Sequence, residues 1–300
     1  MIIKPQSILL MLLATQLLGP TALALAADPH LQTADELSSD QTLTPDQALV
    51  QACLNGDAAA LETALARGGR LETRHGERGL TPLMLAIYRD HPKLVQLLLE
   101  RGANPNASNL QSHTPLIMAA AGGQSDLISL LLQHKAQLEA QDQGGNTALM
   151  WAAFWGHLQV ARQLLAMGAD PNRRNHEHNH ALLLAAFGGA GQDSRQLMNG
   201  PQHHSKAGRH LPLHFDDRET SELAELLIVK GAEADLRNHQ GQTALMLFAA
   251  KGKAGPVKLL LAAGASAQRR DSQGLRATDY ARRAGFERLA RELDSYLPTP

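Results

Sequence analysis

Thr81-Pro82-Leu83-Met84 is the first of a series of related phrases in this 300-residue chain. The series continues with Thr114-Pro115-Leu116, Thr147-Ala148-Leu149, His180-Ala181-Leu182 and Thr243-Ala244-Leu245. Successive phrases lie 33 residues apart, except that the last follows after 63 residues. A fixed period of this length predicts stacked units, none of which buries its apolar face alone. The longer step exceeds the period by 30 residues, so the fourth unit carries an insertion of that size.

A second marker, in step with the first, is a Gly-Ala pair after an apolar stretch. The pair begins at Gly102, Gly168, Gly231 and Gly264, and Lys135-Ala136 takes its place in one unit. Glycine lacks the Cβ that clashes in the left-handed conformation, so it suits the residue after a helix. The apolar residues before Gly102, such as Leu94, Val95 and Leu98, have the spacing of one buried helix face. Each unit is therefore predicted to be two antiparallel helices and a turn.

Threonine followed by proline or alanine favours a helix N-cap, because the second residue needs no amide partner inside the helix. With these markers the array resembles the ankyrin repeat family over residues 45–297. The resemblance implies an all-α solenoid of stacked helix pairs with short β-turn fingers and one long insertion. One departure is consistent, because the family's usual histidine after Thr-Pro-Leu is replaced by an apolar residue. We expect these residues in the core, and they are Met84, Ile117, Met150, Leu183 and Met246.

The two markers also set the boundaries of the chain's parts. We expect a signal peptide at 1–26, a flexible linker at 27–44, one folded domain at 45–297 and a loose tail at 298–300. The domain is expected to comprise a capping repeat at 45–75, repeats at 76–108, 109–141, 142–174, 175–237 and 238–270, and a second capping repeat at 271–297. The insertion in the fourth full repeat is expected at about 192–220.

The first 26 residues follow the pattern of a signal peptide. Lys4 supplies a positive start, residues 8–18 an apolar run, and Ala24-Leu25-Ala26 a small-x-small cleavage site. The apolar run is shorter than the roughly 20 residues that a spanning helix needs. Cys53 is the one cysteine, so an internal disulfide is excluded. We expect cleavage, export to a bacterial periplasm and no membrane insertion afterwards, while a eukaryotic secretory route stays open.

Charge and motif content exclude several classes of function. A formal net charge of -1 at pH 7 disfavours a nucleic-acid surface. The sequence has no glycine-rich phosphate loop, nucleophile elbow or His-Glu-x-x-His motif. We therefore expect no enzyme activity, no catalytic residue and no cofactor.

Histidines concentrate around the insertion. His176, His178 and His180 share one turn, and the insertion holds the candidate metal ligands His203, His204, His210 and His214. Imidazoles at this density can bind zinc, copper or haem, or respond to pH. A polar surface loop that happens to be rich in histidine is the other interpretation, and both stay open. His178 stands where most of the turns have glycine, which predicts a turn of a different shape.

The ankyrin resemblance implies that protein partners bind in a groove lined by the fingers and the first helix of each unit. Four of the chain's ten aromatic residues fall seven or eight positions after the repeated threonine or its counterpart. We expect them to be solvent-facing anchors together with two basic residues, giving the set Tyr88, Arg89, Phe154, Trp155, Phe187 and Lys251. The polar rim is expected at Glu77, Arg78, Gln143, His176 and His239. Packing of Phe154 and Phe187 between neighbouring units is the alternative.

The sequence thus predicts a non-enzymatic exported protein that binds a protein partner as a monomer. The partner's identity is not encoded in these positions. One alternative is a periplasmic immunity protein that blocks a toxin. Another is a metal- or haem-binding accessory, for example in peroxide defence, that uses the histidine-rich insertion.

Overall fold

The structure is a computed structural model that describes residues 43–188 and 217–297, in two compact units. Unit 1 has described residues 43–144, and unit 2 has described residues 145–188 and 217–297. The expected signal peptide, most of the linker, the tail and residues 189–216 lie outside the described residues. So do the candidate ligands His203, His204, His210 and His214.

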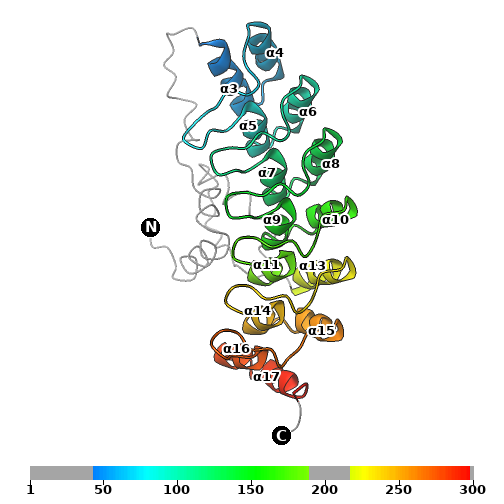
Figure 1. Cartoon of the computed structure of the whole chain (residues 1–300). Helices are drawn as coiled ribbons and strands as arrows, with labels where there is room; N and C mark the ends of the chain where they lie inside the picture. The colour runs from blue at the N-terminus through cyan, green and yellow to red at the C-terminus, as the bar shows by residue number, and fades with distance from the viewer. Residues whose placement is uncertain (1–42, 189–216, 298–300) are drawn as a thin grey trace, which may run out of the picture. The chain divides into compact units, whose positions relative to one another are not determined.

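Unit 1 is a stack of antiparallel helix pairs. Its helices are α3 (Pro45–Asn55), α4 (Ala58–Ala66), α5 (Pro82–Tyr88), α6 (Pro92–Glu100), α7 (Pro115–Ala121) and α8 (Ser125–Gln133). The first helices of the pairs, α3, α5 and α7, contact one another in order, and so do the second helices α4, α6 and α8 (Figure 1). Two layers of helices result, as the two-helix repeat predicts.

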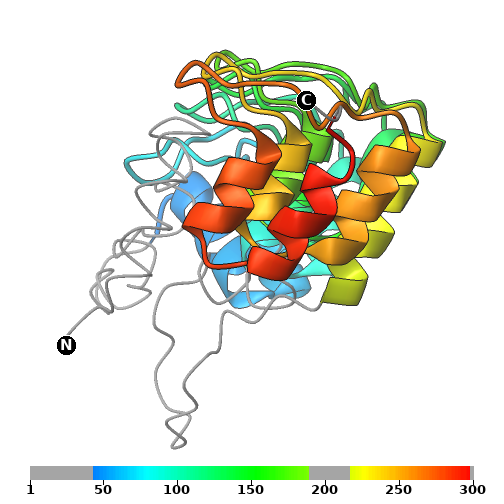
Figure 2. The ribbon, with the colours of Figure 1, turned by 90° about the horizontal axis from the view of Figure 1, so that it is seen from below.

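Unit 2 repeats this arrangement. Its helices are α9 (Ala148–Phe154), α10 (Leu158–Ala166), α11 (Ala181–Phe187), α13 (Asp217–Val229), α14 (Ala244–Ala250), α15 (Ala254–Ala262), α16 (Ala277–Arg283) and α17 (Glu287–Asp294). First helices α9, α11, α14 and α16 follow one another, and the turns that join consecutive repeats gather along one edge of the layers (Figure 2). The predicted fold class, an all-α array of stacked helix pairs, is confirmed.

The predicted N-caps are confirmed in four repeats. The hydroxyls of Thr81, Thr114, Thr147 and Thr243 accept hydrogen bonds from the backbone N–H three residues later, at 3.3–3.4 Å. At the fourth full repeat His180 occupies this position, and its side chain makes no cap hydrogen bond. The start of α11 therefore lacks the side-chain cap that the other four first helices share.

The predicted helix ends are also confirmed. Gly102, Gly168, Gly231 and Gly264 all have φ between 89° and 93°, and Lys135 has φ 67°. Each of these residues lies in the left-handed region just after a second helix, where its N–H bonds back to the last turn. Lysine adopts this conformation at a cost that glycine avoids.

The core is the apolar column that the sequence predicts. Met84, Ile117, Met150, Leu183 and Met246 are each at most 1% exposed. Cys53 is fully buried, and burial raises the pKa of its thiol to about 12, so it stays a neutral, small core residue. Among the described helices none has both the length and the apolar character that a membrane span requires.

The insertion separates the two helices of the fourth full repeat. Helix α11 ends at Phe187, and α13 begins at Asp217. Helix α13 has 13 residues, whereas α10 and α15 have nine. Residues 217–220, which the sequence analysis assigned to the insertion, thus add about one turn to the start of α13.

Polar side chains also join neighbouring repeats, which the sequence analysis missed. Asn172 accepts a bond from the Glu233 N–H at 2.8 Å and donates one to Gly231 O at 2.8 Å. Asp235 accepts from the Ser266 N–H at 2.9 Å, and Asn106 accepts from the Gln137 N–H at 2.7 Å. These side chains stand at one register of the repeat and satisfy the backbone after the next Gly-Ala or Lys-Ala pair.

Candidate partner-binding surface

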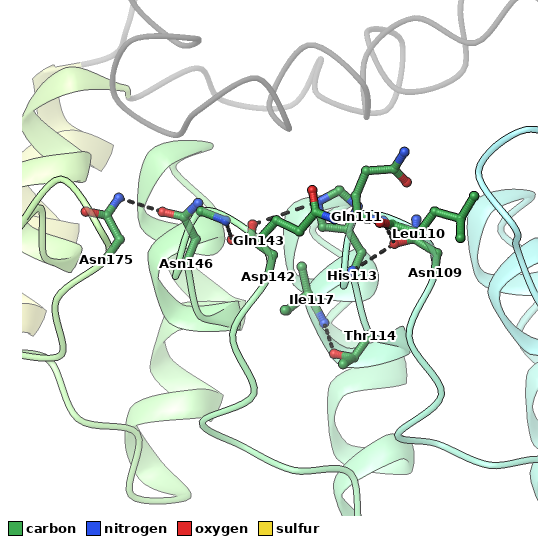
Figure 3. A network of polar contacts seen from close by, with 11 residues as sticks. Asn109, Leu110, Gln111, His113, Thr114, Ile117, Asp142, Gln143, Asn146 and Asn175 are labelled. Atoms are coloured by element: carbon green, nitrogen blue, oxygen red, sulfur yellow. Dashed lines mark hydrogen bonds and ion pairs between the residues drawn. The ribbon is translucent and has the colours of Figure 1, made fainter.

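An asparagine or aspartate side chain holds each finger between repeats. Oδ1 of Asn109 accepts hydrogen bonds from the N–H groups of Gln111 and His113 at 3.0 and 2.8 Å (Figure 3). The same pair of bonds, to residues two and four positions later, is made by Asn175, Asn238 and Asp271. Such bonds replace a regular backbone ladder and fix the shape of the turn. The fingers are therefore well-ordered supports for the side chains at their tips.

The finger that contains His178 has the same shape as the others, so the prediction of a different turn is wrong. His178 has φ 59°, close to φ 60° for Ser112, and the glycines at this register have φ between 64° and 80°. The His178 N–H donates to Asn175 O at 2.9 Å, just as the Gly241 N–H donates to Asn238 O. The Asn175 side-chain bonds hold the backbone in the left-handed region even though the residue is not glycine.

Helix pairs that recur every 33 residues, with a finger held by an Asx residue, identify the repeat. The sequence profile described as "Ankyrin repeats (3 copies)" matches residues 107–175 and 216–295, and the one described as "Ankyrin repeat" matches residues 78–110. The chain belongs to the ankyrin repeat family. The resemblance seen in the sequence is thereby confirmed.

A solved structure shows the same fold. The human ASB11 ankyrin repeat domain superposes with a TM-score of 0.64 and 22% sequence identity, over 84% of this chain and 98% of that domain. At this identity the likeness concerns the fold alone. No curated protein sequence matches the chain.

The expected exposure of three aromatic anchors is wrong. Tyr88 is 9% exposed, Phe154 4% and Trp155 8%. In unit 2 the Phe154 ring packs edge-to-face on Trp151, at 6.5 Å between centroids, and on Trp155, at 5.1 Å. Because these rings pack on one another, most of their surface is removed from water. The alternative for Phe154, packing inside the helix stack, fits its burial.

Other members of the predicted surface do reach solvent. Glu77, Gln143, His176 and His239 are exposed at the finger tips. Arg89, Phe187 and Lys251 are half-buried at the ends of first helices. Arg78 is 9% exposed, so its expected place on the rim is wrong.

Lys251 has an environment that its sequence position does not reveal. It follows α14, and its Nζ donates hydrogen bonds to Phe187 O and to Gly188 O, the latter at 3.0 Å. These carbonyls end helix α11, so the ammonium group caps that helix. Burial, with a contribution from Lys253, lowers the pKa of Lys251 from 10.5 to about 7. The side chain therefore fixes the point where the insertion leaves the repeat.

The lowered pKa of Lys251 predicts a dependence of stability on pH. Because the folded-state pKa lies below the unfolded value of 10.5, folding releases a proton, and stability rises between pH about 7 and 10.5. Lys251→Met removes this group at similar volume. In urea unfolding across this range, the variant is expected to gain less stability with pH than the wild type. Lys258→Met, at a 62% exposed side chain, is the matched control. Parallel curves for Lys251→Met and wild type would refute the assignment.

Two buried histidines were not identified as special in the sequence. His113 is 2% exposed, and its Nε2 lies 3.8 Å from Asp142 Oδ2 in unit 1. Burial, with a contribution from Arg78, lowers the pKa of His113 to about 4. His180 is fully buried, and burial together with Arg174 lowers its pKa to about 4. Both imidazoles are therefore neutral at pH 7 and belong to the interior of the fold.

Within residues 43–188 and 217–297, no group of three or more His, Cys, Asp or Glu side chains is placed to hold a metal ion. The closest approach of two imidazoles there with a printed geometry joins His178 and His239, whose ring centroids are 4.0 Å apart. Both rings stand on the fingers of unit 2, outside the aromatic cluster.

Proposed function

We propose that this protein is a non-enzymatic scaffold that recognises a protein partner through its finger tips. The observation that carries the proposal is the contrast between two registers of one finger. The Asx register is the same kind of residue in most fingers and is buried, at Asn109, Asp142, Asn175, Asn238 and Asp271. The tip register is exposed and differs from finger to finger.

The tip residues have the chemistry of a recognition surface. One register carries Glu77, Leu110, Gln143, His176 and His239, and Leu110 is 64% exposed. An acid, an aliphatic side chain, an amide and imidazoles on a fixed backbone can select a partner by shape and polarity. Since the backbone beneath is ordered before binding, little conformational entropy is lost in the complex.

Half-buried side chains at the ends of the first helices extend this surface. We assign Arg89 in unit 1, and Phe187 and Lys251 in unit 2, to the partner contact. Tyr88, Phe154 and Trp155 support it from within, because their rings are almost wholly buried. A partner would thus contact finger tips and helix ends, while the aromatic cluster maintains the shape of the repeat.

Finger-tip variants test this proposal. In affinity capture with the full chain as bait, a combined Leu110→Gln, Gln143→Ala, His176→Ala and His239→Ala variant is expected to weaken partner binding at least tenfold, or by about 1.4 kcal/mol. The control replaces exposed apolar residues elsewhere, Met167→Gln and Val229→Gln, which are 60% and 74% exposed. Equal binding by the finger-tip variant and the wild type, measured with the captured partner, would contradict the proposal.

We also propose that the chain is exported to a bacterial periplasm. Lys4, the apolar run at 8–18 and the Ala24-Leu25-Ala26 site support it. Cell fractionation and amino-terminal sequencing test it, and a mature protein beginning at Ala27 in the periplasmic fraction is expected. An intact amino terminus in the cytoplasmic fraction would overturn export without affecting the finger-tip proposal.

A further inference from the structure

Two neighbouring fingers of unit 2 bring imidazoles together at their tips. The rings of His178 and His239 have centroids 4.0 Å apart, with their planes inclined at 50°. His239 Nδ1 lies 3.7 Å from Glu177 Oε2, and all three residues are solvent-exposed. The side chains come from positions 61 and 62 residues apart in the chain, on opposite sides of the insertion. Their proximity is therefore a property of the stacked fingers.

The backbone beneath this cluster is fixed on both sides. The His239 N–H donates to Glu177 O at 3.2 Å and joins the two fingers directly. Asn175 accepts from the N–H groups of Glu177 and Asn179, and Asn238 accepts from those of Gln240 and Gln242. The spacing of the two imidazoles is thus set by main-chain contacts, so a ligand would find the rings already close together.

His178 is not required by the turn. At the same register Gly145, Gly241 and Gly274 have positive φ and the finger is the same. Glycine satisfies this left-handed position without the steric cost that a Cβ brings. An imidazole here therefore costs stability and adds a ring that faces His239, which suggests that the ring has a role other than shaping the turn.

We propose that His178 and His239 together bind one late first-row divalent ion, with zinc as the probe. Imidazole suits zinc, copper and nickel, and the Zn–N bond is about 2.0–2.1 Å. Two imidazoles bound to one tetrahedral ion have ring centroids about 5 Å apart. The rings need to separate by only about 1 Å from their present spacing, by side-chain rotation at exposed tips. Water fills the remaining positions.

Glu177 completes the arrangement without being a ligand. A metal-bound histidine commonly donates its other ring N–H to a carboxylate, which orients the ring and raises its basicity. Glu177 Oε2 lies beside His239 Nδ1, so Nε2 is the atom left for the ion. Two protein ligands and one outer carboxylate agree with the described residues having no cluster of three metal-binding side chains.

Histidine modification by diethyl pyrocarbonate, read residue by residue by mass spectrometry, tests the site in the full chain. A zinc titration is expected to protect His178 and His239 over the same concentration range, while His176 on the same finger stays reactive. Because each histidine is measured separately, uptake by the histidines of the insertion does not obscure the result. Failure to protect both His178 and His239 would overturn the proposal.

Matched variants separate ligation from a general surface effect. His178→Gly restores the residue that other fingers have, so the fold is retained, and protection of His239 is expected to need at least tenfold more zinc. Glu177→Gln is expected to weaken protection about tenfold while both histidines remain. His176→Gln is expected to leave protection of His178 and His239 unchanged. Undiminished protection of His239 in His178→Gly would contradict a shared ion.

Discussion

Replacing His180 by threonine is expected to stabilise the protein by about 1–3 kcal/mol. His180 stands at the N-cap of α11, where the other four first helices of the array have a capping threonine. Its side chain is fully buried, and among the described residues neither ring nitrogen finds a hydrogen-bond partner. Threonine would accept the Leu183 N–H and remove two unsatisfied polar atoms from the interior.

The same substitution is expected to reduce the sensitivity of the fold to acid. Burial, with the charge of Arg174, holds the folded-state pKa of His180 at about 4, below its ordinary value of 6.5. As pH falls from 6.5 to 4, the unfolded chain takes up a proton that the folded chain refuses, so stability is lost. His113 contributes in the same direction and remains in the variant. His180→Thr should therefore lose less stability across this range than the wild type.

Urea unfolding at pH 7.0 and pH 4.5 measures both effects, and His180→Ala is the matched control. Alanine removes the imidazole but supplies no cap, so threonine is expected to exceed alanine by about 1 kcal/mol at pH 7. A threonine variant that is less stable than the wild type would show that His180 has polar partners that offset its burial. Equal losses of stability in acid would show that His180 is protonated in the folded state.

The repeat itself was predictable because its signals are local. Thr81 caps the residue three positions later, and Gly102 ends a helix through its own φ, so each rule acts within one turn of chain. Since the same local rules recur at one period, errors at a single unit do not spread. His180 shows the limit, because the phase of the repeat identified an N-cap position that the side chain does not fill.

The candidate surface was less predictable because exposure depends on what fills the neighbouring register. Ala121 and Phe154 occupy equivalent positions, yet one is small, while the other packs on Trp151 and Trp155. An aromatic side chain long enough to reach its neighbours buries itself, which a rule for an average repeat does not capture. The Asx residues of the fingers could have been found, since Asn109, Asn175 and Asn238 recur in step with the other markers.

Contacts across the insertion could not be predicted at all. Lys251 donates to Phe187 O and Gly188 O, which lie 64 and 63 residues earlier in the chain. In sequence, Lys251 is one more polar residue after a first helix. Its role follows from the stacking of α14 on α11, which brings an ammonium group to the open end of a helix.

Gly188→Ala is expected to destabilise the protein by about 3 kcal/mol or more. Gly188 follows α11 with φ -85° and ψ -130°, which do not themselves demand glycine. The constraint is space, because a Cβ added here would lie 1.7 Å from Phe154 O and 2.5 Å from the carbonyl carbon. Both of those atoms are backbone, so the end of α11 has to move away from α9.

That movement also affects Lys251, which links the Gly188 prediction to a second measurement. If the end of α11 shifts, the Lys251 ammonium loses the carbonyls of Phe187 and Gly188, and its buried environment opens to water. The gain of stability between pH about 7 and 10.5 is then expected to shrink in Gly188→Ala. Gly122→Ala is the matched control, since Gly122 holds the same register in unit 1 and its nearest obstacle is the flexible Gln124 side chain at 3.2 Å. Thermal unfolding of Gly188→Ala at the wild-type temperature, with an unchanged pH profile, would mean that the chain leaves α11 along another path.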